Sequence, residues 1–164
     1  IGSLYRHRSH RDNRKKTIPG VECTLSDISS DALELAADNS KSLKADVRIV
    51  QSDLFEEFAD EKFDIIVSNP PYIRRADIDK LQTEVREFDP HLALDGGEDG
   101  LEFYRNIADE VQNYLKRSGY LICEIGADQW KDVVKIFKEA GAVNARIIKD
   151  FTDKDRILEA RFDN

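Results

Sequence analysis

The sequence lacks long apolar runs. No stretch of its 164 residues approaches the roughly 20 apolar residues that span a membrane, and no signal peptide is recognisable, so we expect no membrane partner. Cysteines are few as well. Cys23 and Cys123 lie inside apolar, strand-like runs, which is typical of small buried residues in a reducing cytoplasm. We expect a cytoplasmic protein without a metal site, because the cysteine spacing is wrong and the three histidines do not cluster with the cysteines.

An excess of positive charge is also absent. The chain has 33 acidic and 25 basic residues, which gives a formal net charge of −8. A broad nucleic-acid interface needs a basic face, so the charge balance disfavours nucleic acid as a partner, although a small local contact stays open. The length suits one domain with a sizeable core, and we expect a monomer.

The most informative stretch lies at residues 63–72. Residues 63–67 are mainly apolar and β-branched, which predicts a buried strand. Asn69, Pro70, Pro71 and Tyr72 follow after one serine. A proline has no N–H, holds φ near about −65° and keeps the preceding residue extended, so the strand must end here. The pattern predicts a stiff, exposed elbow (residues 69–72) at the carboxyl end of a strand, where ligands of open α/β sheets bind.

The elbow has a specific chemical use. Asn69 offers a side-chain carbonyl and Pro70 a backbone carbonyl, and two acceptors at fixed spacing bind both hydrogens of a planar –NH2 group. Tyr72 can lie flat against that group. Holding both N–H bonds aims the nitrogen lone pair at an electrophile, which is catalysis by orientation. The alternative interpretation is a proline-rich turn with a capping asparagine.

Acidic residues follow two further predicted strands. Residues 21–27 are expected to form a strand that ends at Asp27, and residues 47–51 a strand followed by Asp53 and Leu54. In nucleotide-binding folds, a carboxylate at the end of the second strand accepts hydrogen bonds from ribose hydroxyls. Asp53 and Leu54 stand where the end of the third strand would meet an adenine ring. For Asp53 alone, capping of the next loop is an equal alternative.

Residues 1–20 show no helical or strand periodicity, and we expect a loop or disorder there. Six of them are basic and one is acidic, so a basic arm that binds nucleic acid is one interpretation. We favour another. Codons that encode residues 5–12, read one base later, can encode Thr-Gly-Thr-Gly-Ala-Ile-Ala-Ile, the glycine-rich loop that the fold requires. We hypothesise that residues 3–16 are a frame-shifted reading of that loop, so that residues 1–20 are its aberrant remnant.

The remainder of the chain alternates between strands and helices, which predicts an α/β fold. Strands are expected at 120–125, 143–150 and 156–162, and helices from Ser29 or Ser30 onward, at 73–88, at 101–116 and at 129–140. The last two strands are joined by a short polar turn and should pair antiparallel. Residues 89–101 contain three glycines and are anchored by leucines, which indicates an ordered loop and a candidate substrate wall or lid.

The Asn-Pro-Pro-Tyr elbow after an apolar strand resembles the signature of S-adenosylmethionine-dependent methyltransferases that act on planar nitrogen. Further segments are similar to one such family, the protein-(glutamine-N5) methyltransferases that act on peptide chain release factors. The similarity runs from about residue 21 to 162. The segments that show it are Glu84-Val85-Arg86, Asp89-Pro90, Ala93-Leu94, Gly96-Gly97-Glu98-Asp99-Gly100-Leu101 and Glu124-Ile125-Gly126 with Gln129. The family usually has glutamate where Asp89 stands, and only Gly2 corresponds to its glycine loop.

The resemblance implies a Rossmann-like, seven-stranded methyltransferase fold over residues 21–164. Its sheet would be mostly parallel with a C-terminal antiparallel hairpin, and its first strand and glycine loop would be truncated or aberrant. It also implies methyl transfer from S-adenosylmethionine to the side-chain amide nitrogen of a glutamine in a release factor, with no metal or general base. The residues implied are Gly2, Asp27, Ile28, Asp53, Leu54 and Asn69 for the cofactor, Asn69, Pro70 and Tyr72 for catalysis, and these three with Pro71 for the substrate.

Two alternatives stay open. One is a methyltransferase that acts on an exocyclic base amine of RNA or DNA, for which Arg74 and Arg75 are the local support. The other is a catalytically inactive α/β module that only binds partners, which the aberrant start would favour.

Overall fold

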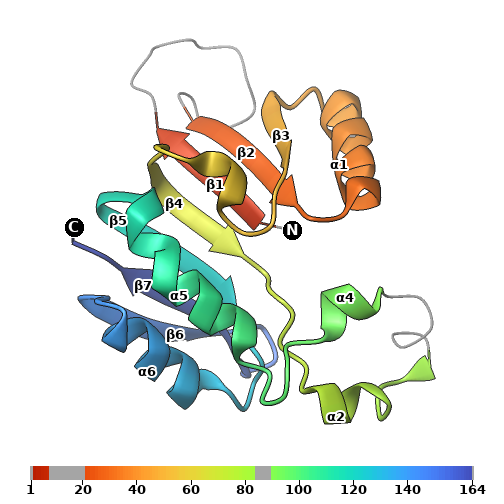
Figure 1. Cartoon of the computed structure of the whole chain (residues 1–164), viewed down its shortest axis with the longest axis vertical. Coiled ribbons are helices and arrows are strands. Elements are labelled where there is room, and N and C mark those ends of the chain that lie inside the picture. The colour runs from red at the N-terminus through yellow and green to blue at the C-terminus, as the bar shows by residue number, and fades with distance from the viewer. Residues whose placement is uncertain (1, 8–20, 84–89, 164) are drawn as a thin grey trace.

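The computed structural model describes residues 2–7, 21–83 and 90–163, with the backbone alone at residues 2–7. Within these residues, seven strands form one sheet in the order β3-β2-β1-β4-β5-β7-β6 (Figure 1). The strands are β1 (Gly2–His7), β2 (Val21–Asp27), β3 (Val47–Gln51), β4 (Phe63–Ser68), β5 (Leu115–Glu124), β6 (Asn144–Lys149) and β7 (Asp155–Arg161). The helices are α1 (Ser30–Leu43), the 3₁₀ turn η1 (Glu56–Phe58), α2 (Arg75–Ile78), α4 (His91–Leu94), α5 (Glu102–Tyr114) and α6 (Trp130–Glu139).

The local signals in the sequence explain most of these elements. The Ser29 side chain accepts a hydrogen bond from the backbone N–H of Ala32 at 3.3 Å, so the predicted N-cap of α1 is confirmed. β2 and β3 have the predicted bounds. β4 ends at Ser68, directly before the elbow. Of the predicted helix at 73–88, the structure shows the short α2 and a further helical residue, Thr83. Residues 84–89 lie outside the description.

The sheet is mixed. β2 pairs parallel with β3, and β4 pairs parallel with β5. β6 and β7 form the predicted antiparallel hairpin, and β7 also runs antiparallel to β5. β1 runs antiparallel to both of its neighbours, β2 and β4. The prediction of a mostly parallel sheet therefore needs correction: only two of the six ladders described are parallel.

The strand β1 corrects a second expectation. We expected a loop or disorder over residues 1–20, and this is wrong for Gly2–His7. Without a strand between them, β2 and β4 would each leave a row of backbone N–H and C=O groups unpaired, and such groups are costly inside a fold. An extended segment satisfies them in either direction. Residues 8–20, the rest of this expectation, lie outside the description.

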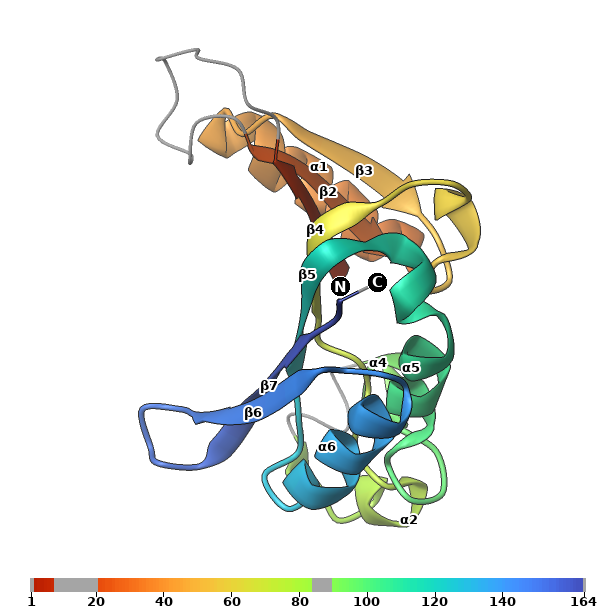
Figure 2. The same cartoon turned by 90° about the vertical axis from the view of Figure 1, so that its left-hand side faces the viewer.

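Helices and sheet enclose one hydrophobic core. α5 packs on β5 and α6 on β6 and β7, and Figure 2 shows both helices on the same face of these strands. The largest side chains between them are fully buried, among them Tyr104, Val111, Leu121, Phe137 and Phe162. α1 packs against β2 and β3 at the other end of the sheet. In the part of the chain that is described, no helix is both long enough and apolar enough to cross a membrane.

Candidate active site

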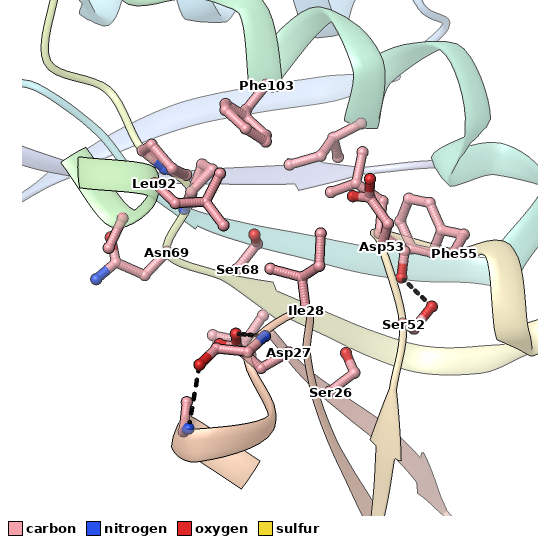
Figure 3. Close-up of a pocket in the computed structure, with 18 of the residues that line it drawn as sticks. Ser26, Asp27, Ile28, Ser52, Asp53, Phe55, Ser68, Asn69, Leu92 and Phe103 are labelled. Carbon is pink, nitrogen blue, oxygen red and sulfur yellow. Dashed lines mark hydrogen bonds between the residues drawn. The ribbon is translucent and has the colours of Figure 1, made fainter. Parts of the chain in front are cut away.

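A cavity of about 480 Å³ opens at the carboxyl ends of β2, β3 and β4 (Figure 3). β2, β3 and β4 end at one edge of the sheet because all three run in the same direction. Helices α4 and α5 close the far side with apolar side chains, of which Leu92, Phe103 and Ile107 line the cavity. The volume lies within the roughly 300–1,000 Å³ of small-molecule and cofactor pockets.

The structure brings most of the predicted residues together here. Seven of them line the cavity: Asp27, Ile28, Asp53, Leu54, Asn69, Pro70 and Pro71. They come from three strand ends that are remote in sequence, as the parallel arrangement of β2, β3 and β4 requires. Their roles toward cofactor and substrate remain predictions. The structure adds Ser26, Ser52 and Ser68 at the same strand ends and Phe103 from α5, none of which was predicted. Leu92 belongs to the loop at residues 89–101 that was predicted as a substrate wall.

The turn after β2 fixes the carboxylate of Asp27. Its Oδ1 accepts a hydrogen bond from the backbone N–H of Ser29 at 2.8 Å, and its backbone carbonyl accepts one from Ser52 N at 3.1 Å. Gln51 Nε2 donates to the carbonyl of Ile28 at 2.9 Å, which joins the same turn to the end of β3. Asp27 is thus held at the cavity, where it can accept hydrogen bonds from a ligand hydroxyl.

The turn after β3 is held by a buried serine. The Ser52 hydroxyl donates to the carbonyl of Leu54 and accepts from the N–H of Glu57, each at 3.2 Å. Leu54 has φ of 45°, in the left-handed region that favours glycine. A bulky residue in this conformation marks local strain of the kind that gathers at ligand sites. This turn places Asp53 on the opposite side of the cavity from Asn69 (Figure 3).

The elbow leaves β4 at the rim of the cavity. Asn69 is exposed there and Pro70 is buried. The chain that follows is fixed by backbone hydrogen bonds: Ile73 N donates to Leu94 O at 3.1 Å, and Gly96 N donates to Ile73 O at 2.8 Å. The loop predicted as a substrate wall therefore has two functions, because it lines the cavity through α4 and supports the elbow from behind.

Tyr72 lies apart from the other predicted residues and does not line the cavity. Its hydroxyl donates to Glu124 Oε1 at 3.1 Å and accepts from Arg156 Nη1 at 3.3 Å, so the side chain is fixed against β5 and β7. Burial raises the pKa of the Tyr72 phenol, and the carboxylate of Glu124 raises it further. Contact between its ring and a planar substrate group remains a prediction.

Gly2 lies between the ends of β2 and β4. In the sheet register it is opposite Ser26 on one side and Ser68 on the other, one residue before Asp27 and Asn69 respectively. The reversed direction of β1 has a consequence at its other end. His7 pairs with Val21, so the chain leaves β1 at the amino edge of the sheet, away from the cavity.

The sequence comparison identifies the class of protein to which this fold and cavity belong. The family model described as methyltransferase small domain matches residues 13–97, which is just over half of the chain. The chain belongs to the methyltransferase small domain family.

Two similar curated sequences share one name. A protein of Geobacter sulfurreducens named release factor glutamine methyltransferase is 40% identical over 146 residues, which are 89% of this chain and 51% of the relative. A protein of the same name from Clostridium acetobutylicum is 43% identical over 144 residues, 85% of this chain and 50% of the relative. The resemblance identified in the sequence is confirmed. The chain spans about half the length of the curated relatives it matches.

A solved structure supports the methyltransferase fold. The crystal structure of a methyltransferase from Pyrococcus furiosus superimposes with a TM-score of 0.62 at 18% identity, over 85% of this chain and 61% of that protein. The α/β class and the Rossmann-like methyltransferase fold are therefore confirmed.

Proposed function

We propose that this chain is the catalytic domain of an S-adenosylmethionine-dependent methyltransferase that methylates the side-chain amide nitrogen of a glutamine in peptide chain release factors. One observation supports this most directly: the Asn-Pro-Pro-Tyr elbow leaves the sheet at the rim of a cavity that also holds Asp27 and Asp53. The names of the similar curated proteins agree with this substrate.

The cavity residues fit the nucleoside part of S-adenosylmethionine. Asp27 would accept hydrogen bonds from the ribose hydroxyls, and Asp53 and Leu54 would hold the adenine. Ile28 and Leu92 line the cavity yet leave 45% and 59% of their surfaces exposed, and a planar base would cover such apolar surface. When bound, the cofactor supplies a methyl group on a positively charged sulfur.

The elbow would orient the acceptor. Asn69 Oδ1 and the Pro70 carbonyl would each accept one hydrogen of the glutamine –NH2 group, which turns the nitrogen lone pair toward the methyl group. An amide nitrogen is a poor nucleophile because its lone pair is delocalised, so orientation is the main contribution that the protein can make. A new N–C bond would form as the S–C bond of the bound cofactor breaks, so that the methyl group would pass from sulfur to nitrogen. The alkylated nitrogen is acidic and releases its extra proton to water, so this chain needs no general base.

A nucleic-acid substrate finds less support in the geometry. Arg74 Nη1 lies 2.9 Å from Asp128 Oδ2, and Arg75 Nε lies 2.9 Å from Asp95 Oδ2. The guanidinium groups of Arg74 and Arg75, the local support for this alternative, are therefore neutralised by carboxylates. A phosphate backbone needs unneutralised positive charge to release counterions on binding.

The proposal includes the frame-shift hypothesis for residues 3–16. In a fold of this class, a parallel first strand delivers a glycine loop to the carboxyl edge, where the cofactor binds. Here β1 is antiparallel and its C-terminal end, His7, lies at the amino edge. Resequencing the gene tests the hypothesis, and an unshifted reading frame through this region would refute it.

Methyl transfer from labelled S-adenosylmethionine tests the function. We expect label in a purified release factor and none in a release factor whose acceptor glutamine is replaced by alanine. Label in RNA or DNA instead would favour the base-amine alternative. Calorimetry with S-adenosylmethionine should accompany the assay. A catalytically inactive α/β module that only binds partners would show no binding heat.

A further inference from the structure

Gln129 is a buried polar residue whose side chain joins three segments of the site. It is 2% exposed, whereas glutamine is mostly found at protein surfaces. Its Nε2 donates to the carbonyl of Tyr72 at 2.9 Å and to the carbonyl of Gly100 at 3.1 Å. Its Oε1 accepts from the backbone N–H of Gly126 at 3.1 Å. Both amide hydrogens are thus used, and a buried amide that is satisfied in this way specifies one local arrangement.

Glycines allow the backbone to approach this amide closely. A Cβ atom at Gly100 would lie 2.5 Å from Gln129 Nε2 and 2.5 Å from the Tyr72 carbonyl oxygen. A Cβ atom at Gly126 would lie 2.5 Å from Gln129 Oε1, and one at Gly96 would lie 2.8 Å from the Cα of Tyr72. Real Cβ atoms do not approach other atoms so closely. Gly100 and Gly126 therefore fit the Gln129 contact only as glycines, and Gly96 allows the close approach of the Tyr72 backbone.

The contact at the Tyr72 carbonyl controls the elbow because of the proline that precedes it. Pro71 has a fixed φ, and few free torsions separate the carbonyl of Pro70 from that of Tyr72. A shift at the Tyr72 carbonyl is therefore passed on to Pro70. The other anchor of Tyr72, its hydroxyl bound to Glu124 and Arg156, fixes the far end of the side chain and not the backbone.

We infer that Gln129 is a positioning residue that fixes the backbone of the elbow and thereby aims the Pro70 carbonyl at the acceptor amide. It does not line the cavity, so it acts through Tyr72 and not on a ligand. The identity of the acceptor rests on the proposed function. The control of the elbow by Gln129 does not, and it can be measured without any substrate.

Amide hydrogen exchange of the full chain tests this control. In Gln129→Met, which keeps length and volume but loses both donors, we expect the N–H groups of Ile73 and Gly96 to exchange roughly tenfold faster, as local opening becomes easier. The N–H of Phe162, bonded to Gly119 O at the far end of the sheet, should be unchanged. Gln112→Met is the matched control, because Gln112 also donates its amide to a carbonyl, that of Ala140, at the other end of α6.

A second variant distinguishes positioning from a general structural role. Gln129→Glu presents a carboxylate to two carbonyl oxygens at neutral pH, and a donor only after protonation. We expect its methyl-transfer rate relative to wild type to rise as the pH is lowered, a rescue that the Met variant cannot show. For Gln129→Met, kcat should fall roughly 10- to 100-fold, in line with a misplaced acceptor. Affinity for S-adenosylmethionine should stay within about twofold, since Gln129 lies outside the cavity.

The exchange rates of the Ile73 and Gly96 N–H groups decide whether the inference stands. Unchanged exchange at Ile73 and Gly96 in Gln129→Met overturns the inference, and so does a uniform acceleration that includes Phe162, which would mean global destabilisation. Selective acceleration supports it even if the wild-type protein methylates no release factor. That combination would refute the proposed function while the positioning role stands.

Discussion

At the scale of single residues, Tyr72 directs its hydroxyl away from the cavity and toward a carboxylate and a guanidinium. The ring is half-buried and packs against the core, and the hydroxyl donates to Glu124. We expect Tyr72→Phe to lower the free energy of unfolding by about 1–2 kcal/mol, because Glu124 and Arg156 lose a hydrogen-bonding partner. Urea denaturation measures this. Methyl transfer should change far less than in Tyr72→Ala, which removes the ring. Equal losses in both variants would show that the hydroxyl itself takes part in the reaction.

Asp150 stabilises the β6–β7 turn through its ionised form. The hydroxyl of Thr152, then the N–H groups of Lys154 and Thr152 and the side chain of Arg156, lower the pKa of Asp150 from 3.8 to about 2. A depressed pKa means that its stabilisation is complete above the ordinary value and is lost as the pH falls toward 2. The free energy of unfolding, measured from pH 5 to pH 2, should therefore fall less steeply in Asp150→Asn. Parallel curves for the two proteins would contradict this assignment.

At the scale of elements, the strands that surround the site could be predicted from the local sequence pattern. β2 and β3 have the expected bounds because β-branched, apolar residues alternate there and a polar turn follows each. The elbow followed from proline stereochemistry. By contrast, the support behind the elbow depends on Gln129 and on three glycines spread over 30 residues, which meet only in the folded chain. Local pattern could not reveal that Tyr72 faces β5 and β7, because these partners are remote in sequence.

In the loop behind the elbow, we expect an added methyl group to cost less at Gly97 than at Gly100. Gly97 and Gly100 both have left-handed φ, of 88° and 76°, so alanine at either should cost about 1–2 kcal/mol for the backbone alone. At Gly97 the nearest atom is a carboxylate oxygen of Glu102, which can rotate away, and Glu102 Cβ at 3.0 Å needs only a small shift. At Gly100 the new Cβ meets the Tyr72 carbonyl, and we expect about 1–3 kcal/mol more.

Thermal or urea unfolding of the two variants, Gly97→Ala and Gly100→Ala, checks this difference. Methyl transfer adds a second comparison. Gly100→Ala should lower kcat by more than the fraction of unfolded protein explains, because it displaces the elbow. Gly97→Ala should retain most of its activity. Similar kinetics in the two variants would argue against support of the elbow by this loop.

At the scale of the whole molecule, the fold class could be predicted because strands and helices alternate along the chain, while the direction of β1 could not. β1 fills the gap between β2 and β4, and a strand of either direction can pair with both. The residue pattern at 2–7 therefore does not indicate the direction of the strand. The expectation of a loop had another cause, because residues 1–20 show no helical or strand periodicity. The cavity was predictable from the shared direction of β2, β3 and β4, and one wall from the loop at residues 89–101, whereas the contribution of α5 through Phe103 and Ile107 was not.

A restored glycine loop should change cofactor affinity. We expect a chain in which residues 5–12 are replaced by Thr-Gly-Thr-Gly-Ala-Ile-Ala-Ile to bind S-adenosylmethionine at least about tenfold more tightly, because the glycine loop and the helix N-terminus after it would then meet the ligand. Isothermal calorimetry on both chains measures the dissociation constants. Equal affinities would mean that the restored loop adds nothing to cofactor binding, and the frame-shift hypothesis would lose its physical basis.

The central claim is that Asn69 Oδ1 and the Pro70 carbonyl accept the two hydrogens of one planar –NH2 group. The most direct test is to measure kcat and the dissociation constant of S-adenosylmethionine for Asn69→Ala, with Asn106→Ala, an exposed asparagine on α5, as the matched control. The account predicts that kcat for a release factor falls about 100-fold or more while cofactor affinity weakens much less, and that the control is unchanged. An equal loss of both quantities would contradict it, because Asn69 would then serve the cofactor and not the acceptor.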